Sequence, residues 1–309
     1  MTWFSELFGF SESEAGVRSN IVIDGASVHS AANSRSFAHG TLEIPTLGEL
    51  RTQAGQVSSS VKGTLQIRQV VANAQELHRD PANAGSLFQV ASQFNLLEMV
   101  SPDVTPDQGI TRYESDRTQG PACAMACAAG TLYRNWFAQT TKHQIDTLAE
   151  VGASLGNDAD RYWQMRNGYA LLTGDCPTDT PTDHDELRIG VHYDTEVTLE
   201  GADHLVSQAY CSALPIAYSP VSADEVEPLA RLVLNSSYEA TFAAGAVNAE
   251  RTGNNSVFLT LIGGGVFGNP SAWIIDAIER AATIYAHTEL DVAIVSFGNS
   301  NPELQRMLG

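Results

Sequence analysis

The chain has 309 residues, of which 43% are hydrophobic, and its 36 acidic and 17 basic residues give a formal net charge of −19. The length and the apolar content suffice for one large domain or two ordinary ones with a substantial core. So negative a surface repels the phosphates of nucleic acids and anionic lipids, and we expect neither a nucleic acid nor a membrane as partner. A small anionic ligand remains possible, because a local nest of backbone N–H groups can override the global field.

Targeting signals and metal-binding patterns are absent from the sequence. The N-terminal stretch MTWFSELFGFSESEAG lacks the basic and apolar regions of a signal peptide, and no segment is long and apolar enough to cross a bilayer. We therefore expect a cytoplasmic protein, or one delivered by a secretion route that needs no signal peptide. Cys123 and Cys127 lie one helical turn apart in an alanine-rich segment and are predicted to be buried core residues. No His or Cys cluster has zinc spacing, so we expect no metal and no other cofactor.

The first half of the chain divides into an extension and the start of a regular pattern. Residues 1–62 are Ser-rich with short apolar runs, and we interpret them as an N-terminal extension that packs on a main domain of residues 63–309. Residues 64–71 and 86–92 are predicted strands, because they are rich in β-branched and apolar residues. A short helical turn is predicted between them at residues 73–78. The polar loop that follows, SPDVTPDQGITRYESDRTQGP, is long for a connector, and long ordered loops are usually functional.

The second half alternates predicted helices and strands. The predicted helices are residues 141–156, 226–249 and 271–287, and the predicted strands are residues 169–173, 187–197, 256–262 and 291–297. Ser222 followed by Glu225 is a capping box that begins the second of these helices. Residues 207–220 fit no predicted element, and we interpret them as a lid or an additional pocket wall. The alternation indicates an α/β fold with a mixed, largely parallel sheet.

The segment LTLIGGGVFGNP, residues 259–270, joins a predicted buried strand to a predicted helix through three consecutive glycines. Glycine is costly to order, so the run needs a structural reason. Gly-rich backbone between a strand and a helix N-terminus forms an anion cradle. The spacing matches neither the P-loop nor the dinucleotide fingerprint, and no Lys follows the glycines, so a diphosphate held by backbone N–H groups fits better. In that case the N–H groups of residues 264–268 point into a cleft; the alternative is a tight turn without a ligand.

Two segments make residues 63–309 resemble the macrodomain family, an ADP-ribose-binding module. The first is VASQFNLLE followed by DRTQGPACAMACAAG, in which Asn95 matches a distal-ribose contact and Gly120 the first phosphate loop. The second is LIGGGVFGNP, which is similar to the family's second phosphate loop and places Phe267 beside the distal ribose. The last strand, with Phe297, resembles the one whose aromatic residue approaches the adenine. The resemblance implies a three-layer α/β/α sandwich.

The same resemblance implies a set of ligand contacts and marks two departures. Where the family often has Gly-Asp-Ile, this chain has Ala-Asn-Ala at residues 72–74, so Asn73 would meet the adenine amino group without a charge. The loop at residues 99–119 is a long insertion. The residues implied at ADP-ribose are Asn73, Asn95, Gly120, Gly263, Gly264, Gly265, Val266, Phe267, Gly268, Asn269 and Phe297.

Cleavage of the bond at the distal ribose C1 requires a group that activates water and one that stabilises the leaving group, and a carboxylate can supply either. Glu98 lies three residues after Asn95, at the same strand end, and Asp116 directly precedes the first phosphate loop. Glu114 alternates with Asp116, so in an extended segment the two point the same way. Gln119 is predicted to orient a water molecule or a ribose hydroxyl. The alternative for each carboxylate is a solvated loop charge, the default in so acidic a chain.

Three functions remain open on the sequence. The leading hypothesis is a metal-free ADP-ribosyl hydrolase that removes ADP-ribose from a modified protein, such as ubiquitin, by hydrolysis at the distal ribose C1. The second is a reader module that binds ADP-ribosylated partners without cleaving them. The third is an α/β scaffold whose glycine turn holds no ligand. A carboxylate directed at the distal ribose would favour the hydrolase over the reader.

Overall fold

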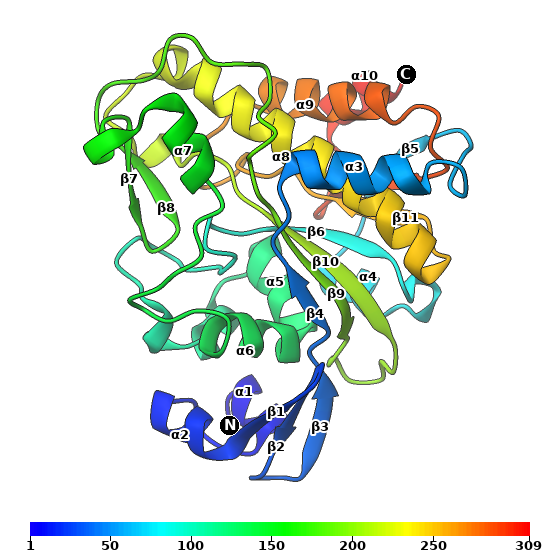
Figure 1. Cartoon of the computed structure of the whole chain (residues 1–309). Coiled ribbons are helices and arrows are strands. Elements are labelled where there is room, and N and C mark those ends of the chain that lie inside the picture. The colour runs from blue at the N-terminus through cyan, green and yellow to red at the C-terminus, as the bar shows by residue number, and fades with distance from the viewer.

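A seven-stranded mixed sheet forms the centre of the protein, described over residues 1–309 by a computed structural model (Figure 1). The strand order is β4-β9-β10-β6-β11-β12-β5. Its strands are β4 Thr41–Glu43, β5 Gln66–Val71, β6 Leu87–Ala91, β9 Gly190–Glu196, β10 Leu205–Cys211, β11 Ser256–Leu259 and β12 Asp291–Ser296. The neighbours from β10 to β5 pair in parallel, whereas β9 is antiparallel to both β10 and β4. The predicted mixed, largely parallel sheet is confirmed.

Helices cover both faces of this sheet and make the predicted three-layer sandwich. The helices are α1 Trp3–Phe8, α2 Glu14–Asn20, α3 Leu47–Val57, α4 Ala74–Arg79, α5 Gln119–Ala126, α6 Ala128–Trp136, α7 Ala149–Leu155, α8 Ala223–Thr252, α9 Ser271–Ile284 and α10 Pro302–Leu308. The layer of α3, α8 and α9 packs on one face, and α4, α5 and α6 lie on the other (Figure 1). Both faces of β6 are therefore covered, which explains why an almost wholly apolar, buried segment forms that strand.

Helix α8 has 30 residues, of which 20 are buried. It begins where the capping box predicts, because the Glu225 carboxylate accepts hydrogen bonds from the Ser222 amide at 3.1 Å and the Ser222 hydroxyl at 2.6 Å. Small residues along α8 let it approach β6, β10 and β11 closely. No helix of the protein combines the length and the apolar composition needed to cross a bilayer.

Two sequence expectations about secondary structure are wrong. The helix predicted over residues 141–156 begins only at Ala149, because Asp146 Oδ1 accepts a hydrogen bond from the Leu148 amide at 2.9 Å and a turn closes at residues 140–143. Residues 205–211, which the sequence analysis assigned to no element, form β10 in the middle of the sheet. A smaller hairpin of β7 Trp163–Arg166 and β8 Tyr169–Leu172 lies outside the main sheet.

The N-terminal residues form a module of their own. Helices α1 and α2 pack with the sheet of β1 Ile21–Asp24, β2 Ser27–Ser30 and β3 Arg35–Ala38, at the opposite end of the molecule from α9 and α10 (Figure 1). Their buried side chains share a core with residues 99–113 of the insertion and with α5 and α6. Strand β4 and helix α3, which also precede residue 62, belong instead to the sheet and to the outer helical layer. The division of the chain at residue 62 into two domains stays a prediction.

Glu12 fastens this module to the insertion. Its carboxylate accepts hydrogen bonds from the Ile110 amide at 2.9 Å, the Thr111 amide at 2.6 Å and the Trp136 indole N–H at 2.8 Å. We expect Glu12→Ala to lower the free energy of unfolding by about 2 kcal/mol, because it leaves these donors without an acceptor. Chemical denaturation measures the change. Glu14→Ala, which removes an exposed carboxylate of the same module, is the control, and equal losses in both variants would contradict this role for Glu12.

Candidate functional site

A cleft with two lobes opens at the carboxyl ends of the parallel strands, where ligands bind in open α/β sheets. Lobe one has a volume of about 300 Å³ and lies beyond β6 and β11. Lobe two has a volume of about 500 Å³ and lies beyond β5 and β12. Thr118, Gln119, Thr260 and Leu261 line both lobes, so the lobes are two halves of one elongated cleft.

The glycine-rich loop after β11 forms one wall of lobe one. Two of its amides turn inward, since Gly264 donates to the Leu261 carbonyl at 3.2 Å and Gly268 to the Gly265 carbonyl at 3.1 Å. The amides of Gly265, Val266 and Phe267 donate to no protein atom. The expectation that the N–H groups of residues 264–268 all face the cleft is therefore wrong for the two ends of the loop. Three consecutive free donors remain, which is the arrangement of an anion nest.

The N-terminus of α5 forms the opposite wall. The amides of Gln119 and Gly120 donate to no protein atom, Pro121 has no N–H, and the Thr118 side chain does not cap the helix. Gly120 is needed here because a Cβ at this position would lie 2.1 Å from the Ala91 carbonyl oxygen at the end of β6. The free amides and the helix dipole both favour a negative charge at this point.

Glu98 brings a carboxyl group to lobe one from the turn after β6. Its side chain is 2% exposed, and neither carboxyl oxygen has a hydrogen-bond partner in the protein. Burial raises the pKa of Glu98 to about 8, although the Arg134 guanidinium, 3.8 Å from Oε1, acts in the opposite direction. A carboxyl group with such a pKa keeps its proton at neutral pH, so it can donate that proton to a bound molecule.

Asp116 lines the same lobe in a different environment. It is partly exposed, and its Oδ1 accepts hydrogen bonds from the Thr118 amide at 2.9 Å and the Thr118 hydroxyl at 2.7 Å. The two carboxyl groups of lobe one thus differ, one being buried without partners and the other partly solvated and hydrogen-bonded. Such a difference separates an acid from a base in many hydrolytic sites.

Asn95 and Gln119, two predicted site residues, serve the scaffold. Asn95 is buried away from both lobes, where its Nδ2 donates to Gln144 Oε1 at 2.8 Å and its Oδ1 accepts from the Leu97 amide at 3.2 Å. It therefore shapes the turn that carries Glu98. Gln119 lines the cleft, but its Oε1 accepts from the Ala91 amide at 3.0 Å and its Nε2 donates to the Gln89 carbonyl at 2.8 Å. Its amide joins α5 to β6 and is not free to orient water.

Four other predicted residues lie outside the cleft lining. Glu114 is exposed, and the 3-10 turn Thr111–Ser115 removes the extended geometry that would align it with Asp116. Gly268 has a φ of 75° and closes the glycine loop, with Asn269 donating its side-chain N–H to the Leu214 carbonyl at 2.9 Å. Gly264 packs on Ile274. Gly264, Gly268 and Asn269 set the shape of the glycine loop.

Aromatic side chains that the sequence analysis did not single out complete lobe one. The ring of Phe267 lies 5.5 Å from that of Tyr169 and 6.1 Å from that of Tyr218. Tyr218 belongs to the 207–220 segment, and the amide of its neighbour Ala217 donates to the Phe267 carbonyl at 2.9 Å. The segment after β10 is thus a wall of the pocket, one of the two roles considered for it. No sequence motif marked Tyr169 or Tyr218, because only the fold brings β8 and the segment after β10 together.

Lobe two contains the two residues predicted for the adenine side. Asn73 lines it while its Oδ1 caps α4 by accepting from the Gln75 amide at 2.8 Å, which leaves the side-chain N–H groups free. Phe297 lines it with 80% of its surface exposed, as a platform on which a flat ring could stack. Arg117 adds a positive charge at the same lobe and forms no ion pair within the protein.

Comparison with known proteins finds similarity only among solved structures, at low sequence identity. No protein-family model matches the chain, and no curated protein sequence matches it. The structure is similar to that of poly(ADP-ribose) glycohydrolase from Deinococcus radiodurans in complex with ADP-ribose, with a TM-score of 0.46 and 12% identity over 86% of this chain and 91% of that chain. It is also similar to poly(ADP-ribose) glycohydrolase from Thermomonospora curvata, with a TM-score of 0.44 and 11% identity over 95% and 94% of the two chains. The chemistry of the site therefore rests on this chain's own residues.

The raised pKa of Glu98 makes a prediction about stability. Between the ordinary value of 4.5 and about 8, the folded protein holds a proton on Glu98 that the unfolded chain has lost. Ionisation of Glu98 therefore lowers the free energy of unfolding as the pH rises through this window. We expect Glu98→Gln to lose less unfolding free energy than the wild type between pH 5 and pH 9, measured by urea denaturation. Parallel stability curves for the two proteins would contradict the buried, protonated state of Glu98.

Proposed function

We propose that the protein is an ADP-ribosyl hydrolase. The observation that carries the proposal is the Glu98 carboxyl group, buried without hydrogen-bond partners in a lobe that also presents the free amides of the glycine loop. Burying a carboxyl group without partners costs free energy, so a protein that keeps one in a cleft uses it chemically more often than structurally.

The cleft fits the parts of ADP-ribose in order. Lobe two, with Phe297 and Asn73, has the flat apolar platform and the polar edge that an adenosine needs. The diphosphate would lie between the amides of residues 265–267 and those at the N-terminus of α5, where its charge meets free N–H donors. The distal ribose would then lie in lobe one, beside Phe267 and Glu98. No lysine is needed for this arrangement, because backbone donors hold the charge.

The two carboxyl groups of lobe one suit hydrolysis at the distal ribose C1. Glu98, protonated at neutral pH, would donate its proton to the oxygen that leaves C1 as the glycosidic bond breaks. Asp116, partly solvated, would accept a proton from the water whose oxygen forms the new bond to C1. The products are ADP-ribose and the acceptor hydroxyl or carboxyl group with its proton restored, so charge and atoms balance.

A reader module is the second candidate. It would use the same N–H donors and the same platform, but it would gain nothing from a buried carboxyl group at the ribose end. Glu98 therefore favours the hydrolase. The acceptor would be a modified protein, with ubiquitin as one candidate, and a basic partner surface would suit this acidic chain. ADP-ribose chains are the alternative substrate to assay beside it.

Release of ADP-ribose from ADP-ribosylated protein and from poly(ADP-ribose) tests the catalytic assignment. We expect Glu98→Gln to reduce the rate by about 10²–10⁴-fold, the usual contribution of a general acid, and Asp116→Asn to reduce it less. Glu114→Gln, which removes an exposed carboxylate from the same loop, should leave the rate unchanged. Wild-type rates in the Glu98 variant would refute the assignment, and binding of ADP-ribose by a wild type without turnover would favour the reader.

The free amides of the glycine loop make a separate prediction about binding. Val266→Pro deletes one donor, and we expect ADP-ribose to bind about tenfold more weakly or worse, because a hydrogen bond to a charged phosphate is lost. Val266→Ala keeps the N–H and is the matched control, since the Val266 side chain is 62% exposed. Calorimetric titration measures both. Equal affinity of the two variants would show that the amide of residue 266 does not contact the ligand.

A further inference from the structure

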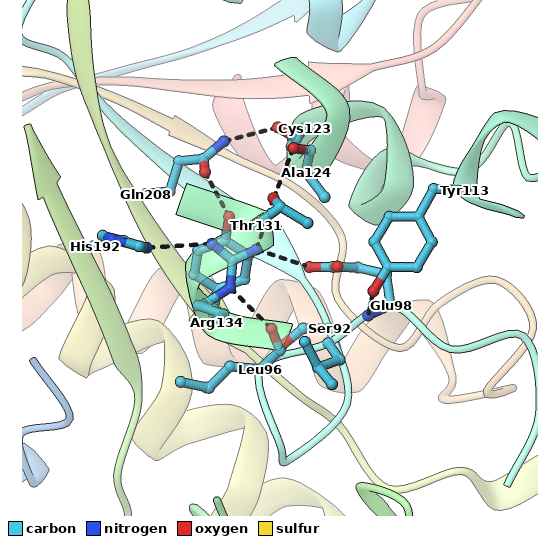
Figure 2. Close-up of polar contacts among 12 residues, drawn as sticks. Ser92, Leu96, Glu98, Tyr113, Cys123, Ala124, Thr131, Arg134, His192 and Gln208 are labelled. Carbon is cyan, nitrogen blue, oxygen red and sulfur yellow. Dashed lines mark hydrogen bonds and ion pairs between the residues drawn. The ribbon is translucent and has the colours of Figure 1, made fainter. Parts of the chain in front are cut away.

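Arg134 on α6 is the largest side chain that is completely buried in the protein. Figure 2 shows its guanidinium between His192 and Glu98. Nε donates to the Leu96 carbonyl at 3.1 Å, Nη2 donates to the Thr131 hydroxyl at 3.1 Å, and Nη1 lies 3.2 Å from His192 Nδ1. Arg134 lines neither lobe, so it cannot touch a molecule bound in the cleft.

Glu98 is the only carboxyl group within ion-pair distance of this buried cation. On the side of β9, His192 is neutral, because burial and the neighbouring guanidinium lower its pKa. On β10, the ring of Tyr210 lies 3.6 Å from the guanidinium carbon, and burial raises the pKa of its hydroxyl group. Buried arginine charges are costly unless an anion compensates them. Any negative charge that Arg134 meets must therefore come from Glu98.

The other buried titratable groups that face Glu98 are also neutral. Tyr113, from the insertion, accepts a hydrogen bond from the Glu98 amide at 3.1 Å, and burial raises the pKa of its hydroxyl group. Burial likewise raises the pKa of the Cys123 thiol on α5. Asp116, across lobe one, is partly solvated and bound to Thr118. The charge state of Glu98 is thus set by burial on one side and by Arg134 on the other.

Arg134 also fixes the backbone that carries Glu98. The Leu96 carbonyl that accepts its Nε–H lies two residues before Glu98, in a turn where Leu96 itself has a φ of 63°. A left-handed leucine is strained and persists only when its surroundings hold it. The same guanidinium therefore holds the turn and faces the carboxyl group.

We propose that Arg134 is a positioning residue for the hydrolysis: it holds the Glu98 carboxyl group in lobe one and stabilises the carboxylate that remains after Glu98 has donated its proton. This inference rests on the proposed function. When the proton moves from Glu98 to the leaving oxygen and the C1–O bond breaks, a negative charge appears 3.8 Å from a positive charge that is already in place. A preorganised charge of this kind lowers the barrier without reorganisation of the site.

If Arg134 were only structural, its replacement would affect folding and leave the ionisation of Glu98 unchanged. The test therefore compares variants that keep the positive charge of residue 134 with variants that remove it. Arg134→Lys keeps the charge, Arg134→Met removes it, and Arg134→Gln removes it while keeping N–H donors for the Leu96 carbonyl and the Thr131 hydroxyl. If the Met variant does not fold, the Gln variant still shows the effect of removing the charge. Carbon-13 NMR of the side-chain carboxyl groups, with Glu98→Gln to assign the signal, follows the titration of Glu98 in the protein without ligand.

We expect Glu98 to titrate at higher pH in the Met and Gln variants than in the wild type, and near the wild-type pH in the Lys variant. In the hydrolysis assay, the kcat of the two neutral variants should fall about tenfold or more while ADP-ribose binds with unchanged affinity, and Lys should restore part of the rate. An unchanged Glu98 titration in a folded neutral variant would overturn the proposal. If the wild type hydrolyses no substrate, the proposed function fails, yet the titration still decides whether Arg134 sets the ionisation of Glu98.

Discussion

A buried guanidinium facing a buried carboxyl group is the constraint on which the site depends. Arg134 has no carboxyl group other than that of Glu98 within ion-pair distance, and neither carboxyl oxygen of Glu98 has a hydrogen-bond partner. Each of the two groups would be costly in the interior alone. Their separation of 3.8 Å is too long for a hydrogen bond, so the hydrogen-bonding capacity of the buried carboxyl oxygens is unused in a residue that lines lobe one.

The junction between α5 and β6 gives this pair its place at the cleft. The Gln119 side chain accepts a hydrogen bond from the Ala91 amide and donates one to the Gln89 carbonyl, both in β6. Gly120 lies so close to the Ala91 carbonyl that no Cβ fits between them. These contacts bring the N-terminus of a helix against the end of a central strand. The result is a set of free N–H donors beside Glu98, whose side chain lies next to Gly120, in a lobe that the glycine loop after β11 also lines.

Local patterns in the sequence were sufficient for the layers and the glycine loop, because strand alternation, the Ser222–Glu225 capping box and Gly-rich turns act over a few residues. Glu98 was predicted at the cleft from its position at a strand end. Asn95 was misassigned because its partner, Gln144, is distant in the sequence, and so was Gln119, whose amide bonds to β6. Strand β10 was missed since its strand character depends on burial between β9 and β6. Arg134 could not be found from spacing, because its burial is purely tertiary.

In the proposed function, the cleft holds ADP-ribose with its distal ribose at the Glu98 carboxyl group. A crystal structure of the Glu98→Gln variant with ADP-ribose tests it most directly, since the substitution keeps the shape of the site. The account predicts the diphosphate on the amides of residues 265–267 and the C1 hydroxyl oxygen within about 3 Å of the residue 98 side chain. A ligand bound elsewhere, or bound with its distal ribose pointing away from residue 98, would contradict the claim.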